Sequence, residues 1–166
     1  MSLEEGATIF GYRVNNPSRY GVVDFDKSGQ ALSIEEKPLI PKSNYAVTGL
    51  YFYDENASKY AHMITPSERQ ELEISSLNQI YLSKGLLTVN ILQSGITWLD
   101  TGTHKSLFEA AQFVNVLQSR QGIRICCPEV IAYRNNWITK SDLMAQAKEL
   151  EKSGYGNYLM KVCHTT

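Results

Sequence analysis

The sequence predicts an α/β domain followed by a helical appendix that begins near residue 103. Three observations favour this class. Short runs rich in β-branched and aromatic residues, bounded by turn residues, fill the first third of the chain. Segments with helical spacing of apolar residues then alternate with one further strand, and the last third shows helical spacing alone. We therefore expect a tail at residues 1–5, an α/β part at 6–102 and a helical region at 103–166.

The strands follow from period-two patterns and turn signals. In the run after the Asp26 to Gly29 turn, Leu32 and Ile34 alternate with polar residues, which predicts a hairpin with one apolar face. The run YAVTGLYFY is continuously apolar, which is typical of a strand covered on both faces, and its Gly49 suggests a close approach to the backbone. The expected strands are residues 7–14, 20–25, 31–36, 45–53 and 86–92.

The helices follow from the longer apolar spacing and from capping residues. Thr103 is the expected N-cap of a helix that stops at Gly122. The other expected helices are residues 57–64, residues 77–82, a helix from Ser141 and a short stretch at 158–162. The residues expected on the buried sides of the two longer ones are Leu107, Ala110, Ala111, Val114, Leu117, Leu143, Met144, Ala147 and Leu150.

Composition and charge exclude several classes of partner. The 166 residues include 16 Lys and Arg against 17 Asp and Glu, so the formal net charge is −1. This balance supplies no positive field for a phosphate backbone, and no apolar run reaches membrane-spanning length. We therefore expect neither nucleic acid nor a membrane as a partner. Three cysteines without metal-like spacing favour a reducing, cytoplasmic setting.

The glycines contain no phosphate-binding loop. Neither G-x-G-x-x-G nor G-x-x-x-x-G-K-[ST] occurs, although such a loop usually opens a doubly wound α/β domain. Gly154 and Gly156 form a lone GxG that follows a helix, so we interpret it as a helix junction. The histidines and Ser75-Ser76 show no triad or nucleophile-elbow spacing.

Two short segments combine charges with restrained backbone. Glu36 and Lys37 end a predicted strand before Pro38, and one acceptor beside one cation suits a sugar hydroxyl next to a phosphate. A solvated charged turn is the alternative. Asp100 lies just ahead of a predicted helix, where a carboxylate suits Mg²⁺ because this ion takes only one or two carboxylates and completes its shell with phosphates and water. A simple helix cap is the alternative for Asp100.

Five motifs together resemble the glucose-1-phosphate thymidylyltransferase family. They share its order and spacing: RYGVVDFD at 19–26, EEKP at 35–38, NYAVTGLYFYD at 44–54, ELEIS at 71–75 and WLDTGTH at 98–104. The resemblance runs from Gly6 to about Met160 and covers about the second half of such an enzyme, without the half that carries the nucleotide loop and the first metal-binding Asp. It implies part of the mixed, Rossmann-like sheet of nucleotide-diphospho-sugar transferases.

The resemblance implies a reaction of dTTP with glucose 1-phosphate to give dTDP-glucose and pyrophosphate, which opens dTDP-rhamnose synthesis for bacterial polysaccharide. Its catalytic residues would be Lys37, on the sugar phosphate, and Asp100, holding Mg²⁺ with Trp98 as packing support. Glu36 would accept hydrogen bonds from glucose hydroxyls. The rest of the implied sugar pocket is Tyr20, Gly21, Val47 and Tyr51, with Glu71 as a further candidate. The family commonly has Thr-Asp where this chain has Ser75-Ser76.

The helical tail resembles the family's subunit interface and a second nucleotide site, through which dTDP-sugars feed back. The segment PEVIAYR at 128–134 keeps the candidate regulatory residues Ile131 and Arg134. Val130 stands where many members have Glu, and Ser94 replaces a frequent Arg. Each lost buried contact weakens binding by about 1 to 3 kcal/mol, so the resemblance implies a weaker regulatory site here.

Three functions remain open from the sequence. The first is the sugar-phosphate part of the enzyme, inactive by itself. The second is a binding module that uses Glu36 and Lys37 without chemistry. The third is a structural oligomerisation unit built on the helical tail. Because half of a sheet leaves an unpaired edge and exposed apolar surface, we also expect a homo-oligomer.

Overall fold

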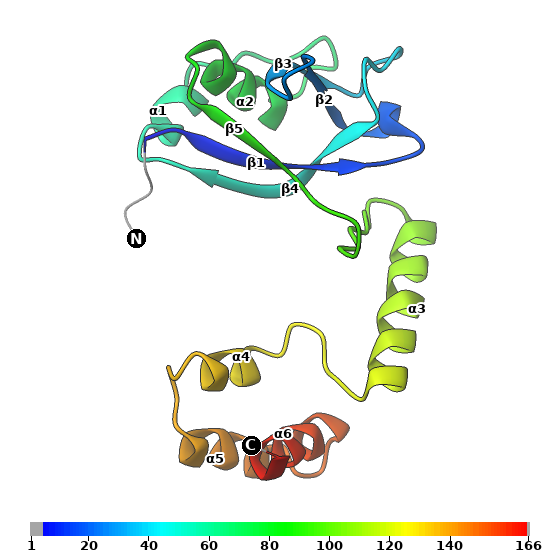
Figure 1. Cartoon of the computed structure of the whole chain (residues 1–166), viewed down its shortest axis with the longest axis vertical. Coiled ribbons are helices and arrows are strands. Elements are labelled where there is room, and N and C mark those ends of the chain that lie inside the picture. Colours follow the sequence, from blue (N-terminus) through cyan, green and yellow to red (C-terminus); the bar gives the residue numbers. More distant parts are fainter. Residues whose placement is uncertain (1–4, 166) are drawn as a thin grey trace. The chain divides into compact units, whose positions relative to one another are not determined.

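The computed structural model describes residues 5–165, so most of the expected tail at 1–5 lies outside the described residues. The chain forms two compact units, Met1–Trp98 and Leu99–Thr166, which are coloured blue to green and green to red in Figure 1. The boundary after Trp98 lies a few residues before the one at 102 that the sequence predicts. No helix among residues 5–165 is both long enough and apolar enough to cross a bilayer.

The first unit is a five-stranded mixed sheet with helices. Its strands are β1 (Ala7–Arg13), β2 (Gly21–Phe25), β3 (Ala31–Glu36), β4 (Tyr45–Tyr53) and β5 (Leu87–Ile91), and its helices are the 3₁₀ turn η1 (Pro17–Arg19), α1 (Ala57–Ala61) and α2 (Ile74–Ser83). The strand order is β3-β2-β4-β1-β5. Only β1 and β5 are parallel, and the other neighbours are antiparallel, so the predicted α/β class is confirmed.

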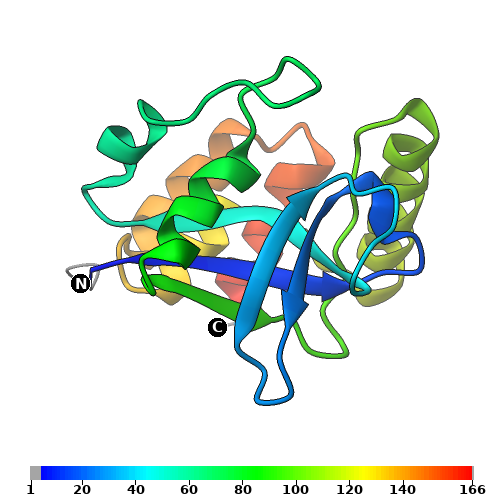
Figure 2. The same cartoon turned by 90° about the horizontal axis from the view of Figure 1, so that it is seen from above.

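The helix α2 covers one face of this sheet, as Figures 1 and 2 both show. Its Leu77 and Tyr81 form a buried cluster with Ala7 of β1. A second cluster on the same sheet contains Ile9, Val23, Ile34 and Val47, with Leu82 of α2 packed against it. Side chains alternate between the faces of a strand, so these residues belong to the face that α2 covers.

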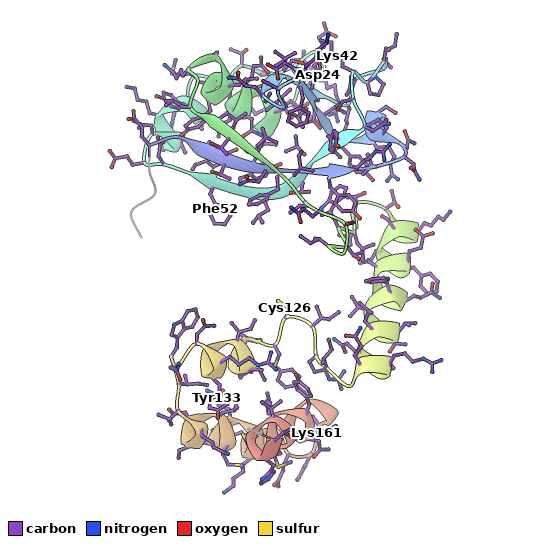
Figure 3. The ribbon with its side chains drawn as sticks, viewed as in Figure 1. Asp24, Lys42, Phe52, Cys126, Tyr133 and Lys161 are labelled. Atoms are coloured by element: carbon purple, nitrogen blue, oxygen red, sulfur yellow. The ribbon has the colours of Figure 1, made fainter. Side chains whose placement is uncertain are left out.

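The prediction that β4 is covered on both faces is wrong for its second half. Leu50 and Phe52 are 50% and 46% exposed, because they alternate with Tyr51 and Tyr53 and belong to the face that α2 leaves open. Figure 3 shows Phe52 on this side of the sheet. Gly49 has nothing within 4 Å of an added Cβ, so the expected close approach to its backbone is also wrong. On the edge strand β3, Ile34 is buried as expected, whereas Leu32 is 58% exposed.

The second unit consists of helices: α3 (His104–Gln121), α4 (Pro128–Arg134), α5 (Lys140–Glu149) and α6 (Gly154–Thr165). The caps of α3 are as predicted. Thr103 accepts from the Ser106 amide in a reciprocal capping box, and Gly122 ends the helix with a left-handed φ of 65°. For α5 the N-cap is Thr139 rather than a residue at Ser141, again in a capping box.

The core of the second unit lies among α4, α5 and α6. Its buried residues are Cys127, Val130, Leu143, Ala147, Leu159 and Cys163. Leu143 and Ala147 are therefore buried as predicted, whereas Leu150 is 41% exposed. Of the stripe expected on α3, only Ala110 is buried among the described residues, and Leu107 is 54% exposed. The spacing of α3 thus predicts the helix correctly but not its burial.

Candidate functional site

The hairpin of β2 and β3 brings four of the predicted site residues to one end. Its register pairs Gly21 with Glu36 across the two strands. Lys37 and Tyr20 are the next residues beyond this pair, and the Lys37 amide donates a hydrogen bond of 3.0 Å to the Tyr20 carbonyl. The ladder therefore continues past the last residue of β3. Residues that lie 15 or more apart in the sequence are adjacent here because the strands are antiparallel.

Gly21 lies at the centre of this end of the hairpin. A Cβ added to it would lie 3.0 Å from Ser75 Oγ, 3.2 Å from Glu36 Oε2 and 3.8 Å from Val47 Cβ. Gly21 itself is buried, and its φ is not left-handed, so crowding rather than backbone conformation explains the glycine. The structure thus brings Gly21, Glu36 and Val47 together, as the sequence predicts, and adds Ser75.

Ser75 is the member of this group that sequence reasoning missed. It lies in the first turn of α2, where its hydroxyl donates a hydrogen bond to Glu36 Oε2. The expected helix starts only at Leu77, because the polar pair Ser75-Ser76 separates Ile74 from the apolar residues that follow. The buried residues of α2 nevertheless follow one helical face, and Ser75, Asn78 and Tyr81 are three residues apart. That spacing was the available signal.

The two predicted pocket tyrosines, Tyr20 and Tyr51, each pack against another aromatic ring. Burial raises the pKa of Tyr51 above its ordinary value, and the negative charge of Glu36 adds to this shift. Tyr51 also stacks on Tyr53, with ring centroids 5.9 Å apart. Tyr20 packs edge-on against Trp98 at 5.1 Å. The structure thus places Tyr51 near the charge of Glu36, and Tyr20 beside Lys37 through the hydrogen bond between their backbones.

Lys37 combines an exposed side chain with a constrained backbone. Its φ is 43°, a left-handed value that a residue with a side chain rarely adopts, and Pro38 follows it directly. The neighbouring hydrogen bond from its amide to Tyr20 holds this geometry. Lys37 forms no ion pair within residues 5–165. Its ammonium group is thus available to a ligand anion at the end of β3.

A cavity of about 860 Å³ adjoins this group between β3 and α2. Glu36, Lys37 and Ser75 contribute to its wall, as do Arg69 and Glu73. Glu73 is buried and accepts hydrogen bonds from Ser67 Oγ at 3.0 Å and from Arg69 Nη1 at 3.2 Å. The cavity therefore carries two cationic side chains beside several carboxylates, a mixture suited to a ligand with both hydroxyls and a phosphate.

Glu71, the further sugar-pocket candidate, lies apart from this wall. Its side chain is exposed and forms an ion pair of 2.8 Å with Arg69 Nη2. It is not among the residues that line the cavity, whereas Glu73 is. Within the ELEIS motif the structure thus places the second glutamate and the serine at the cavity. Glu71 contacts two residues of the cavity wall, Arg69 through this ion pair and Ser67 through a backbone hydrogen bond of 2.9 Å.

Asp100 belongs to the second unit and forms a local turn. Its Oδ1 accepts a hydrogen bond of 3.2 Å from the Gly102 amide. Thr103, not Asp100, caps α3, so the alternative that Asp100 is the helix cap is wrong. Among the described residues no group of three His, Cys, Asp or Glu side chains could hold a metal ion, so Asp100 would contribute a single carboxylate. That Asp100 and Lys37 serve the same reaction, as the family resemblance implies, stays a prediction.

The candidate regulatory residues lie on α4. Ile131 is 45% exposed, and Arg134, also exposed, is the last residue of the helix. Val130 is buried among Leu143 and other apolar residues of the second unit. Position 130 therefore packs in the core of this chain, and its valine stabilises the helices rather than facing a ligand.

Comparison with known proteins shows the family of the chain. The family model described as nucleotidyl transferase matches residues 2–116, well over half of the sequence. The chain belongs to the nucleotidyl transferase family. Glucose-1-phosphate thymidylyltransferases are similar to it: that of Neisseria gonorrhoeae is 57% identical over 155 residues, which are 93% of this chain and 54% of the relative. That of Mycobacterium tuberculosis H37Rv is 52% identical over 157 residues, covering 95% and 54%.

Solved structures agree with the fold. A Bacillus anthracis protein, solved as a glucose-1-phosphate thymidylyltransferase in complex with sucrose, is 43% identical with a TM-score of 0.59. The matched region covers 66% of this chain and 44% of the Bacillus anthracis chain. A UDP-glucose pyrophosphorylase complexed with UDP-glucose is 19% identical, with a TM-score of 0.57 over 65% and 43% of the two chains, which shows the fold alone. This nucleotidyl transferase chain spans about half the length of the curated relatives it matches.

Proposed function

We propose that this chain carries the sugar 1-phosphate site of an enzyme that makes dTDP-glucose and pyrophosphate from dTTP and glucose 1-phosphate. The observation that carries the proposal is the junction of Gly21, Glu36 and Val47 beside Lys37, where an acceptor, a cation and a buried glycine surface share one strand end. The similarity to thymidylyltransferases supports the choice of dTTP. At the adjoining cavity Lys37, which forms no ion pair among residues 5–165, suits a phosphate.

The chemistry needs little from the protein besides charge and position. A sugar phosphate monoester has a second pKa of about 6, so its oxygen is already an anionic nucleophile at neutral pH. That oxygen forms a bond to the α-phosphorus of dTTP, and the bond from this phosphorus to the bridging β-phosphate oxygen breaks, which releases pyrophosphate. No proton has to move. The obstacle is the repulsion between two polyanions, so positive groups and alignment supply the catalysis.

The residues of this chain divide these tasks. Lys37 neutralises the sugar phosphate and aligns it for attack. Glu36 accepts hydrogen bonds from the sugar hydroxyls, with Gly21 and Val47 presenting backbone groups. Tyr20 and Tyr51 pack along the hexose. Asp100 offers one carboxylate to a divalent ion, and Mg²⁺ accepts such a donor together with phosphate oxygens and water. Bound there, the ion would neutralise the phosphates.

Calorimetric titration with glucose 1-phosphate and a coupled assay of pyrophosphate release test the proposal together. We expect weak binding, at about millimolar affinity, and no turnover by the 166-residue chain alone. Lys37→Ala should abolish the binding signal, because it removes the main positive charge on the phosphate. Lys27→Ala is the matched control, since Lys27 is exposed at the other end of the same hairpin. Equal loss in both variants would contradict the proposal.

Binding without turnover is also what a non-catalytic binding module would show. The assay distinguishes the two when dTTP and Mg²⁺ are supplied together with the part of a related thymidylyltransferase that lies outside the matched region. Pyrophosphate release in that mixture supports the enzyme. Glucose 1-phosphate binding with no release under any such condition supports the module.

A structural role in association is favoured by the surface of α3. Leu107, Phe108 and Val116 are 54%, 62% and 56% exposed, so α3 presents apolar side chains that a partner could cover. We propose that this helix supports a homo-oligomer. Light scattering should then report a dimer or larger species, and Leu107→Asp should shift it toward monomer, whereas Lys105→Asp on the same helix should not. A monomeric wild-type chain would contradict this role.

A further inference from the structure

Ser75 holds the carboxylate that the proposed function assigns to the sugar. Its hydroxyl donates to Glu36 Oε2, and Ser75 itself is buried, with 6% of its surface exposed. The bond joins two elements that are distant in sequence, since Glu36 ends β3 and Ser75 lies in the first turn of α2. The contact is therefore a product of the packing of α2 on the sheet rather than of local sequence.

The surroundings leave the Glu36 carboxylate one defined orientation. A glutamate side chain has several rotatable bonds, and ordering it costs conformational entropy. Ser75 occupies one carboxylate oxygen, Oε2, from the α2 side. The same oxygen lies over Gly21, because a Cβ there would come within 3.2 Å of it. The other oxygen, Oε1, is the one left for a ligand.

We infer that Ser75 is a positioning residue, which orients Glu36 so that Oε1 accepts from a hydroxyl of a hexose 1-phosphate. The inference rests on the proposed function for the identity of the ligand, but the Ser75 contact itself does not. An acceptor fixed before binding loses no further freedom when the sugar arrives, so orientation raises affinity. A hydroxyl suits this task, since it donates to a carboxylate at any pH at which the carboxylate is ionised.

The variants that test this are Ser75→Ala, Ser75→Thr and Ser58→Ala, in the full 166-residue chain. Ser75→Ala removes the donor, and Ser75→Thr keeps it. Ser58 is the matched control because it is an exposed serine on helix α1 of the same unit. The first measurement is made without ligand: three-bond couplings of the Glu36 side chain by NMR report its rotamer populations. The second is titration with glucose 1-phosphate and with deoxy analogues of it.

The expected result is one dominant Glu36 rotamer in the wild type, in Ser75→Thr and in Ser58→Ala, with averaging in Ser75→Ala. Glucose 1-phosphate affinity should fall by about three- to tenfold in Ser75→Ala and recover in Ser75→Thr. The deoxy analogue that lacks the hydroxyl bound by Glu36 should bind wild type and Ser75→Ala equally. A rescue by threonine is not expected of a residue that only fills space.

The positioning role of Ser75 and the proposed function can fail separately. If the Glu36 rotamers are the same in Ser75→Ala as in the wild type, or if the rotamers change while sugar affinity does not, the positioning role is overturned and the proposed function stands. If Glu36 is ordered by Ser75 but the wild type gives no response to glucose 1-phosphate, the sugar ligand is wrong, and with it both the inference and the proposed function. Circular dichroism of each variant checks that the fold is kept.

Discussion

Tyr81 of α2 donates a hydrogen bond of 2.7 Å to Oδ1 of Asp54, the residue after β4. The other oxygen of Asp54 accepts from the Gly6 amide at 2.8 Å. One carboxylate therefore joins the helix, the end of β4 and the start of β1. Tyr81 is fully buried and packs against the rings of Tyr53 and Tyr60. This contact sets the position of α2 on the sheet and hence that of Ser75 at its other end.

The first prediction is a loss of stability of the first unit in acid. Hydrogen bonds from Tyr81, Gly6 and Asn56 lower the pKa of Asp54 below its ordinary value of 3.8. Because the folded pKa is the lower one, this stabilisation is complete above pH 3.8 and is lost as the pH falls through the folded value. Tyr81→Phe should lower the urea midpoint at pH 7 and flatten its decrease in acid.

Trp98 fluorescence measures this in a Trp137→Phe background, which leaves Trp98 as the sole tryptophan of the sequence. Tyr60→Phe is the control, because its ring packs against Tyr81 at 5.1 Å but its hydroxyl makes no hydrogen bond among residues 5–165. A Tyr81→Phe chain with the same acid dependence as the wild type would show that Asp54 is held by its backbone donors alone.

The second prediction concerns Gly21. Gly21→Ala places a methyl group 3.0 Å from Ser75 Oγ and 3.2 Å from Glu36 Oε2, so both side chains must shift. We expect glucose 1-phosphate affinity to fall at least tenfold, at a stability cost of about 1 to 3 kcal/mol. Gly49→Ala on β4 is the control, since nothing lies within 4 Å of its added Cβ. If the two variants bind alike, Gly21 does not contact the ligand site.

The third prediction tests a hydrogen bond between α4 and α6. The Tyr155 hydroxyl donates to Glu129 Oε2, and Cys127 Sγ lies 3.0 Å from the same hydroxyl. This bond lowers the pKa of Glu129 below its ordinary value of 4.5, so its contribution is complete above that pH and is lost as the pH falls through the folded value. Tyr155→Phe should destabilise the second unit by about 1 kcal/mol at pH 7.

Hydrogen exchange of the α5 and α6 amides, followed by mass spectrometry, reports the stability of this unit separately from the sheet. Tyr133→Phe serves as the control, because Tyr133 packs against the same core and its hydroxyl makes no hydrogen bond among the described residues. Equal exchange rates in wild type and Tyr155→Phe at pH 7 would refute a stabilising role for the bond.

The fourth prediction uses two glycines of α6. A Cβ on Gly156 would lie 2.1 Å from the Leu150 carbonyl oxygen and 2.9 Å from that of Ala147, and backbone atoms cannot give way as a flexible side chain can. Gly156→Ala should therefore cost about 3 kcal/mol or more in the second unit. Gly154→Ala should be neutral or slightly stabilising, because its Cβ would meet only Arg124 Nη2 at 3.5 Å.

Thermal melting at 222 nm distinguishes the two variants. The lone GxG of the sequence thus separates into a position that needs glycine and one that does not. The structure places both glycines at the start of α6, shortly after α5 ends at Glu149, which agrees with the interpretation of this segment as a helix junction. A Gly156→Ala chain that melts at the wild-type temperature would mean that the helices move apart at little cost.

Local patterns account for the parts of the fold that the sequence predicted best. The strands at Ala31–Glu36 and Tyr45–Tyr53 and the caps of α3 match the prediction residue by residue. Alternation and capping act within a few residues, so they are readable in one segment. The helix α4 is not among the predicted helices, because its seven residues show too little apolar periodicity. Pro128 at its first position is nevertheless typical of a helix N-terminus.

The candidate site likewise has one part that local sequence predicts and one part that depends on tertiary packing. The EEKP segment identifies Glu36 and Lys37 from the sequence alone, because the strand before them and Pro38 after them restrict their backbone. Ser75 became part of the site only when α2 packed against β3. The exposure of Leu50 and Leu107 likewise depends on which elements cover which faces.

The sequence by itself determined the strands, the longest helix with its two caps, the charged strand end and the family, since each depends on residues near one another in the chain or on matched motifs. Only the tertiary structure decided that Ser75 joins Gly21, Glu36 and Val47 and binds the Glu36 carboxylate. The physical reason is that the strand register and the docking of α2 bring together residues far apart in the chain, and the sequence patterns of single segments carry no record of those distances.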